Sequence, residues 1–516
     1  MSVNGPDNGR STARALPFTL FGMLFQLGIA FASGIIVARV IGPAAYGVFS
    51  LARTWCETAN LITKAGFDTG VVRYLGAHAD RDDQRAQQSV LRRMLWVVFA
   101  LGSLPVVALL AGGASWLEAS VYSYAGFAVV LTALALSLPF MAVLQVLGGM
   151  FRGYLRIGPR VACELILQPA ARLLIIVVLF VLGFELGAVV AGTVLSFMLA
   201  ATVLFVVARN SFLKPIPGIS DAPEQAPWSK LLEVGKYSLI IALTTVVAGL
   251  LNRADLIFLG YYVSADDVGR YAVVQTIVVL IALFNGALNQ TLAPLIARSY
   301  AAADMVALRS VIQRHSRWVA LATFPVFVVI AVFGDRLMVV FGKDFTVHWS
   351  VVGLLALVQF LCALLSSAGF LLSMTGRHKA ELYIMLTGLV FNMALSLWFI
   401  PRWGLTGAAA ATCCAIVGAN LLRAAHVYLV FRIASIGRDT LRPLLIGVAL
   451  AALMLAGMSL YPASNAVLDA ALYGGMFTAT YVALVLRFGL VDEDRVLLAA
   501  VLRRVPLAWR WRCESR

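Results

Sequence analysis

The chain has 516 residues, of which 61% are hydrophobic and only 13% charged, with a mean hydropathy of +0.91 and a net charge of +15. Soluble domains carry about 25% charged residues. This composition therefore excludes a water-facing globular protein, a disordered chain and a disulfide-rich secreted scaffold. It predicts an all-α polytopic membrane protein, because helices satisfy their own backbone hydrogen bonds in lipid.

Apolar stretches of about 20 residues are long enough to cross the hydrocarbon core. The first fifteen residues are polar and the first apolar run is too long for a signal peptide, so no cleaved signal is expected. An even number of spans would place both termini on one side of the membrane. We predict about fourteen transmembrane helices, at residues 16–40, 45–70, 94–113, 120–149, 161–182, 186–208, 231–255, 268–296, 317–334, 350–374, 381–400, 405–430, 442–460 and 467–487.

The distribution of Lys and Arg tests this count of spans. Successive loops between spans lie on alternate sides of the membrane. On this assignment about 29 of the 40 Lys and Arg residues fall on one side, about 6 on the other and about 5 inside spans. By the positive-inside rule the richer side, which holds both termini, is predicted to be cytoplasmic. The net charge of +15 therefore reports topology, and no nucleic-acid partner is expected.

The two halves of the chain resemble one another at a nearly fixed offset. Residues 46–52 align with residues 268–274, so that Gly47 matches Gly269 at an offset of 222 positions. Two further glycine pairs match at an offset of 220. This repeat predicts two parallel six-helix lobes related by a pseudo-two-fold axis along the membrane normal, with a substrate site between them. The predicted parts are a cytoplasmic N-terminus (1–15), an N-lobe (16–208), a linker (209–230), a C-lobe (231–430), two further helices (431–487) and a basic cytoplasmic C-terminus (488–516).

The second span carries an unusual stripe of polar residues. An ionisable group at mid-membrane costs at least about 2.5 kcal/mol, so it usually faces a wet cavity or another charge. At about 100° per residue the stripe covers an arc of about 80°. Either it lines a hydrated path, or its charges neutralise each other as i,i+4 pairs; we favour the path. The stripe consists of Tyr46, Arg53, Glu57, Asn60, Lys64 and Asp68.

Other spans add candidate site residues. In the eighth span, the repeat partner of the second, Gln275, Asn285 and Asn289 share one face and could line the same path or simply join helices. The seventh span ends with Arg253 and Asp255, which point to different faces and so are not expected to pair. Further predicted positions are Arg172 and Lys236 as cavity cations and Arg423 as an interfacial anchor.

The predicted substrate site is cationic. Arginine forks suit phosphate better than a lysine point charge does. A cavity containing Arg53, Lys64, Arg172 and Arg253 would favour a phosphorylated or carboxylated solute, with Asn60 and the eighth-span amides as neutral partners. The carboxylates of Glu57, Asp68 and Asp255 are candidates for ion coupling.

Motifs for catalysis and for nucleotide or metal binding are missing from the sequence. There is no GxxxxGK(S/T), HExxH, CxxC or GxSxG. The acidic residues Asp80, Asp82 and Asp83 lie among arginines, which favours a solvated mixed-charge segment over a metal site. We expect a protein that is not an enzyme and has no metal or cofactor, other than H+ or Na+ as a coupling ion.

Four segments resemble a known family. ARVIGPAAYGVFSLA (38–52), GFDTGVVRYLG (66–76), ADLIFLGYYVSADDVGRYAVV (254–274) and FNMALSLWFIPRWGLTGAAAAT (391–412) are similar to bacterial polysaccharide flippases of the multidrug/oligosaccharidyl-lipid/polysaccharide (MOP) exporter superfamily. The resemblance implies a two-lobed flippase in the bacterial inner membrane that moves a polyprenyl-diphosphate-linked glycan outward by alternating access. It also implies that Arg53, Lys64 and Arg253 bind the diphosphate and that the last two helices border a groove for the lipid tail. Membrane lipid, a glycan polymerase and glycosyltransferases are the implied partners.

Three alternatives remain at the level of sequence. A drug or metabolite antiporter of the same superfamily would bind cations and should have a net acidic cavity. A peptidoglycan-precursor flippase would differ only in its cargo. An integral-membrane sugar polymerase would usually need a sizeable outer loop for its catalytic groups, whereas every predicted outer loop here is far smaller than a domain.

Overall fold

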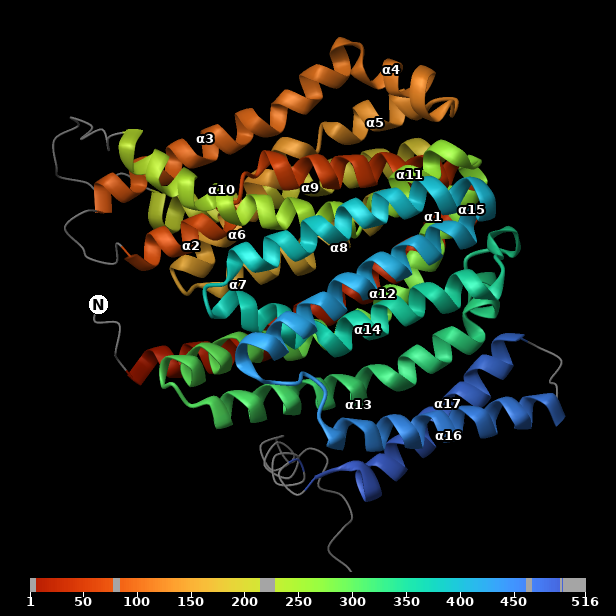
Figure 1. Cartoon of the computed structure of the whole chain (residues 1–516). Coiled ribbons are helices and arrows are strands. Elements are labelled where there is room, and N and C mark those ends of the chain that lie inside the picture. Colours follow the sequence, from red (N-terminus) through yellow and green to blue (C-terminus); the bar gives the residue numbers. More distant parts are fainter. Residues whose placement is uncertain (1–5, 78–83, 214–227, 461–465, 492–493, 495–516) are drawn as a thin grey trace, which may run out of the picture.

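In the computed structural model, which describes residues 6–77, 84–213, 228–460, 466–491 and 494, these residues form a bundle of long helices and contain no β-strand (Figure 1). The predicted all-α membrane architecture is thereby confirmed. The Asp80 cluster, the centre of the linker, residues 1–5 and most of the C-terminal segment lie outside the described residues, as does the side chain of Lys236.

The first half of the chain supplies the first six spans. Its elements are α1 (Pro6–Thr63), α2 (Phe67–Ala77), α3 (Gln84–Ala108), η2 (Leu109–Gly113), α4 (Ala114–Leu117), η3 (Glu118–Tyr122), α5 (Phe127–Ala135), α6 (Leu138–Gly153), α7 (Ile157–Arg160), η4 (Val161–Leu167), α8 (Gln168–Val181), α9 (Leu186–Ala208) and η5 (Arg209–Leu213).

The second half supplies the other eight spans. Its elements are α10 (Trp228–Leu251), α11 (Ala254–Tyr262), α12 (Ala265–Ala301), α13 (Met305–Leu337), η6 (Met338–Val340), η7 (Lys343–Phe345), α14 (Trp349–Met374), α15 (His378–Phe431), α16 (Arg438–Leu460), α17 (Ala466–Leu484) and η8 (Val485–Gly489).

Two of these helices are each long enough for two spans. α1 has 58 residues and bends at Gly42 (φ 75°, ψ 174°), and α15 has 54 residues and bends at Gly404 (φ 53°, ψ −127°). Glycine adopts such positive φ values without the steric penalty of a side chain. By length and composition, ten described helices could cross a membrane, or eleven when the bent pair α10 and α11 counts as one span. Because α1 and α15 each contain two predicted spans and the 37-residue α12 supplies the eighth, the prediction of about fourteen spans agrees with the fold.

Two predicted spans are interrupted. The second span ends as α1 at Thr63, turns through Ala65 (φ 48°) and Gly66 (φ 71°), and resumes as α2. The seventh span breaks between α10 and α11, which meet at 44°. Both spans were predicted as continuous helices. The break in the seventh span falls at Asn252 and Arg253, and it directs Arg253 and the following Asp255 toward different neighbours.

The helices pack as two lobes that meet along α1 and α12. Within the first half, α6 packs on α2, α3 and α9, and α8 packs on α9. Within the second half, α12, α13 and α14 pack on one another and α15 packs on α10, α11 and α14. α16 and α17 pack on α13 and on each other, at the lower edge of Figure 1.

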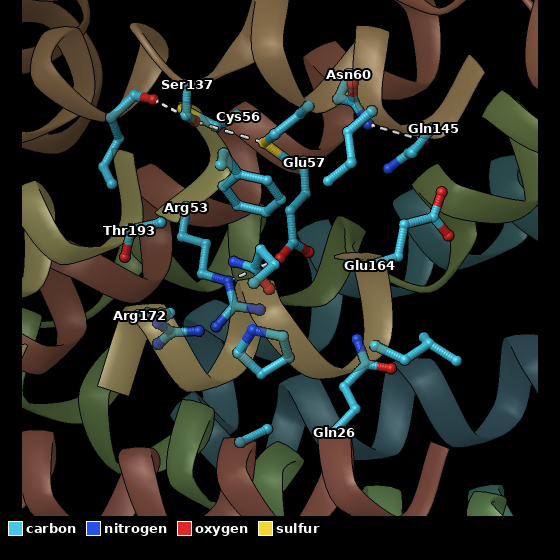
Figure 2. Close-up of a pocket in the computed structure, with 18 of the residues that line it drawn as sticks. Gln26, Arg53, Cys56, Glu57, Asn60, Ser137, Gln145, Glu164, Arg172 and Thr193 are labelled. Carbon is cyan, nitrogen blue, oxygen red and sulfur yellow. Dashed lines mark hydrogen bonds and ion pairs between the residues drawn. The ribbon is translucent and has the colours of Figure 1, made fainter. Parts of the chain in front are cut away.

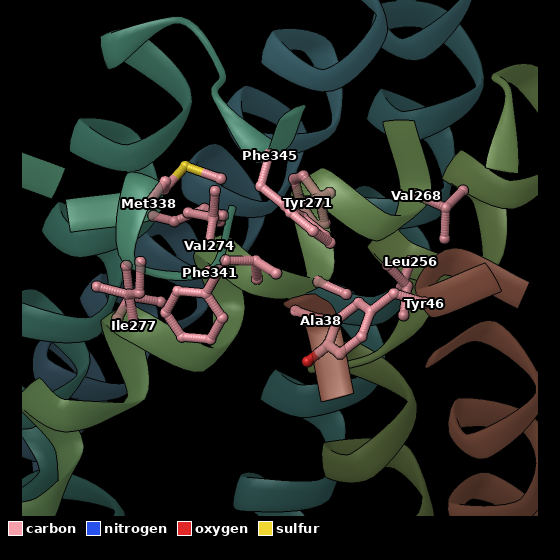
Figure 3. Packing of buried hydrophobic residues seen from close by; sticks show 14 of the residues in the cluster. Ala38, Tyr46, Leu256, Val268, Tyr271, Val274, Ile277, Met338, Phe341 and Phe345 are labelled. Carbon is pink, nitrogen blue, oxygen red and sulfur yellow. The ribbon is translucent and has the colours of Figure 1, made fainter. Parts of the chain in front are cut away.

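A buried apolar cluster joins the lobes at the end of the bundle where α1 bends, which we call the Gly42 end. Figure 3 shows Tyr46 of α1 beside Phe341 and Phe345, which follow α13. The Tyr46 and Phe345 rings meet edge to face with centroids 5.8 Å apart. The Arg39 guanidinium also donates a 2.8 Å hydrogen bond to the Val340 carbonyl oxygen. The lobes are therefore in contact at the Gly42 end.

The environment of Arg423 corrects one prediction. This residue was expected to anchor at the membrane interface, but it lies buried in α15 with 6% of its surface exposed. Its Nε and Nη2 donate to the two carboxylate oxygens of Glu381, at 3.0 and 2.8 Å. A pair 42 residues apart on one bent helix has no local sequence signal, and it forms because the Gly404 bend folds α15 back on itself.

Candidate functional site

A cavity of about 390 Å³ lies inside the first lobe, beside the polar stripe of α1 (Figure 2). It follows α1 from Arg53 to Lys64, a distance of about 16 Å at 1.5 Å per residue. Its other walls come from α5, α6, η4, α8 and α9. The polar and charged lining residues are Gln26, Ser33, Arg53, Glu57, Asn60, Lys64, Ser137, Gln145, Glu164, Gln168, Arg172, Thr193 and Arg253.

Two arginines share one carboxylate in this cavity. Arg53 Nε lies 2.7 Å from Glu57 Oε1, one helical turn away on α1. Arg253, at the break between α10 and α11, approaches the other carboxylate oxygen, with Nη2 3.3 Å from Glu57 Oε2. Of the described residues in the second half of the chain, Arg253 alone lines the cavity. This group of three therefore carries a net positive charge and links the two lobes.

Arg172 of α8 adds a cation that no carboxylate neutralises among the described residues. Its Nε is buried and has no hydrogen-bond partner there. Figure 2 shows its guanidinium and that of Arg53 pointing into the same part of the cavity. Arg172 as a whole is half-buried. Its unneutralised guanidinium, with a buried Nε that has no partner, suits an anionic ligand in the cavity.

The remaining charges of the cavity are paired. Lys64 Nζ lies 3.0 Å from Asp68 Oδ2 of α2, and Arg160 Nε of α7 lies 2.8 Å from Glu164 Oε2. Asn60 Nδ2 donates to Gln145 Oε1 of α6 at 3.3 Å. The excess positive charge is thus confined to Arg53, Arg172 and Arg253, and neutral amides occupy the wall toward Lys64.

Four predicted residues lie away from this cavity, in the second lobe. Asp255 accepts hydrogen bonds from the Tyr271 hydroxyl at 2.7 Å and from Gln275 Nε2 at 3.0 Å. Asn285 Oδ1 accepts from Asn289 Nδ2 at 3.1 Å and from the Ser366 hydroxyl at 2.9 Å. These hydrogen bonds hold the four side chains within the second lobe, although the buried Oδ1 of Asn289 has no partner among the described residues.

The cavity differs in two ways from the site drawn from the sequence. It lies within the first lobe, and among the described residues the second lobe reaches it only through Arg253, whereas the repeat predicted a site between the lobes. Tyr46, at the start of the stripe, is buried against Phe345 and does not line the cavity. The halves carry different side chains at matching positions, so the symmetry of the fold does not extend to the cavity.

Several residues that line the cavity were not predicted from the sequence. Gln26, Gln145 and Gln168 lie in the first, fourth and fifth spans, where single amides in apolar runs were a usable signal. Glu164 lies in the π-helical segment η4, which precedes α8. π-Helical turns are frequent at functional sites, but the sequence gives no sign of one here.

A second, shallow hollow borders the C-terminal pair of helices. It has a volume of about 590 Å³ and lies between Val329 of α13 and α17. Its lining consists of small and apolar residues, namely Val329, Ala470, Ala471, Gly474, Gly475, Thr478, Ala479 and Val482. These residues suit contact with hydrocarbon.

No group of three or more His, Cys, Asp or Glu side chains in the described part of the chain is arranged to hold a metal ion.

Comparison with known proteins places the chain in a family. Residues 36–350 match the family described as "Polysaccharide biosynthesis protein". The chain belongs to this family. A related protein is the probable low-salt glycan biosynthesis flippase Agl15 of Haloferax volcanii, which is 24% identical over 198 residues. That match covers 38% of this chain and 41% of the relative, so the chain matches about two fifths of the length of this curated relative.

Solved structures show that this family member has the fold of the MOP superfamily. The lipid II flippase MurJ in an inward closed conformation superposes with a TM-score of 0.71 at 12% identity, over 91% of this chain and 98% of that one. An inward-facing multidrug resistance MATE transporter of the MOP superfamily gives a TM-score of 0.66 at 14% identity, over 81% and 98%. The resemblance noted in the sequence is confirmed at the level of family and fold.

Proposed function

We propose that this polysaccharide biosynthesis family member is a flippase for a polyprenyl-diphosphate-linked glycan in a bacterial inner membrane, with both termini cytoplasmic. The observation that supports it best is the unneutralised positive charge of Arg53, Arg172 and Arg253. Guanidinium groups bind phosphate through paired hydrogen bonds, and a site with little water strengthens them. The diphosphate would bind at these three residues.

The size of the cavity limits which part of the cargo is recognised. A volume of about 390 Å³ is at the lower end of small-molecule sites. It would hold the diphosphate and the sugar next to it, with Asn60, Gln145 and Gln168 as hydrogen-bonding partners for hydroxyl groups. A longer glycan would extend beyond the cavity, and the prenyl tail would stay in lipid, because transfer of the polar head into hydrocarbon is the costly step. The hollow on α17 would contact that tail.

Transport would follow alternating access between the lobes. The contacts of Arg39 and Tyr46 with the segment after α13 hold the Gly42 end together. In the proposed orientation this end is the outer one, so the conformation corresponds to a state loaded from the cytoplasm. Coupling to an H+ or Na+ gradient would use a carboxylate, for which Glu57, Asp68 and Asp255 are the candidates.

The charge of the cavity also separates the alternatives. A drug or metabolite cation antiporter would be opposed by the excess of guanidinium groups. A peptidoglycan-precursor flippase would use the same diphosphate site, and its cargo would differ beyond the first sugar. In a sugar polymerase, the short connections between the described helices would have to hold the catalytic groups.

The test is flipping of a fluorescent polyprenyl-diphosphate disaccharide in proteoliposomes. Arg53→Ala and Arg253→Ala should each reduce the initial rate at least about tenfold, since a hydrogen bond to a charged group contributes roughly 1.5–3 kcal/mol. Arg402→Ala is the matched control, because Arg402 is exposed and lies over the Trp398 ring, outside the cavity. Wild-type rates in both cavity variants would rule out the cationic site. Accumulation of a cationic dye in place of the glycan lipid would favour the antiporter.

A further inference from the structure

An amphipathic groove on the outside of the first lobe is separate from the cavity. It has a volume of about 550 Å³ and lies between α3, α6, α9 and η5. Its lining residues are Arg92, Leu95, Trp96, Phe99, Phe140, Val143, Ala201, Thr202, Phe205, Arg209 and Leu213.

One end of this groove is charged. Arg92 lies one helical turn before Trp96 on α3, and Arg209 lies one turn after Phe205, where α9 passes into η5. Arg92 Nη2 donates to the Leu213 carbonyl oxygen, which joins the start of α3 to the end of η5. Neither arginine has a carboxylate partner among the described residues. Two cations from separate helices therefore lie together at one end.

The rest of the groove is apolar and aromatic. Trp96 and Phe99 meet edge to face with ring centroids 6.4 Å apart, and Phe99 meets Phe140 at 6.0 Å. Trp96 is 74% exposed and Phe205 42% exposed, so these rings face the surroundings of the protein. A ligand that fits has an anionic head at the arginines and a hydrocarbon tail along the rings.

The groove and the cavity lie on different faces of α6. Phe140 and Val143 line the groove, whereas Met141, Leu144 and Gln145 line the cavity. A ligand in the groove is therefore separated from the diphosphate site by a helix. This position suits a resident lipid of the leaflet better than cargo on its way to the cavity.

We infer that this groove binds an anionic phospholipid of the membrane leaflet in which α3 begins. In the proposed orientation this is the cytoplasmic leaflet, where anionic lipids attract basic residues and basic pockets between helices bind their head groups. Because α6 forms a wall of both sites, a lipid in the groove stabilises the helix that bounds the cavity. The site goes beyond the proposed function and does not depend on the identity of the cargo.

Native mass spectrometry of the full chain released from nanodiscs tests this site. With phosphatidylglycerol mixed into phosphatidylcholine, the wild type should retain phosphatidylglycerol preferentially. Arg92→Gln/Arg209→Gln should bind it about tenfold more weakly, which corresponds to about 1.4 kcal/mol. Arg209→Gln alone leaves the contact of Arg92 with Leu213 intact and should give part of the loss. Arg377→Gln is the matched control, because it removes the same charge at a residue that lies over the Phe431 ring, away from the groove.

A photoactivatable phosphatidylglycerol locates the site. Cross-links should map to peptides containing Trp96 or Phe205, and phosphatidylcholine should not suppress them. Unchanged retention in the double variant, an equal loss in Arg377→Gln or cross-links elsewhere would overturn the inference. Displacement of the lipid by polyprenyl diphosphate at equal concentration would instead assign the groove to cargo. Flipping activity is not needed for any of these measurements, so a failure here is distinct from a failure of the proposed transport.

Discussion

Gly47 of α1 and Gly269 of α12 occupy matching positions of the sequence repeat, and their backbones pack directly against each other where the two lobes meet. A Cβ added to Gly47 would lie 1.9 Å from the Ala265 carbonyl oxygen, and one added to Gly269 would lie 2.1 Å from that of Pro43. Backbone atoms cannot rotate away as a side chain can. The closed Gly42 end therefore requires glycine at both positions.

Substitution of Gly47 should open this end. Gly47→Val would force the lobes apart near Ala265, and the protein should shift toward a conformation open at the Gly42 end. Spin labels at the exposed positions Val40 and Tyr261, in a background without native cysteines, would report a longer distance. Gly28→Ala is the control on the same helix, since its Cβ would meet open space. A distance distribution identical to that of the wild type would refute the steric role of Gly47.

Substitution of Arg172 should weaken anion binding without lowering the stability of the protein. Its buried Nε has no partner in the described structure, so Arg172→Gln removes a costly charge and should leave the thermal unfolding midpoint unchanged or raise it. The same change should weaken binding of inorganic diphosphate about tenfold, because a charge-assisted contact is lost. Calorimetric titration and thermal unfolding of the same preparation measure both effects, and Arg402→Gln serves as the control. A fall in the unfolding midpoint with unchanged binding would mean that Arg172 is structural.

Asp255 is the carboxylate to test for ion coupling. It is 2% exposed and accepts hydrogen bonds from Tyr271 and Gln275, with no cation beside it in the described structure. Asp255→Asn keeps the shape and part of the hydrogen bonding but cannot take up H+ or bind Na+ as a carboxylate. We expect transport that no longer responds to an imposed ion gradient, measured in proteoliposomes with and without the gradient. Tyr271→Phe removes one hydrogen bond and should keep the response, so loss of the response in both variants would indicate a packing defect.

The Arg423 and Glu381 pair should stabilise the second lobe only as a pair. Arg423→Met leaves a buried, unpaired carboxylate and should cost about 3–5 kcal/mol, seen as a lower thermal unfolding midpoint. The double variant Arg423→Met/Glu381→Leu should recover most of that loss, because neither charge then remains buried alone. A double variant that is no more stable than the single one would show that the two residues act independently.

The sequence predicted the helices and their number well, because membrane-spanning segments depend on local composition. Arg53, Glu57, Asn60 and Lys64 were also found as one polar face of the second span, since helical periodicity alone places them together. The side of the membrane on which each loop lies stays a prediction from the charge distribution.

What the sequence could not determine is which distant groups meet. Glu57 receives Arg253 from 196 residues away, Asp255 turns instead to Tyr271, and Arg423 is buried with Glu381. Each of these contacts depends on an interruption of a helix, either the break at Asn252 and Arg253 or the bend at Gly404. Each also depends on how the helices that follow the interruption pack. Composition and periodicity are properties of single segments, so they determined a fourteen-span bundle with a polar stripe. Only the tertiary structure decided that the cavity lies within one lobe and that three arginines carry its charge.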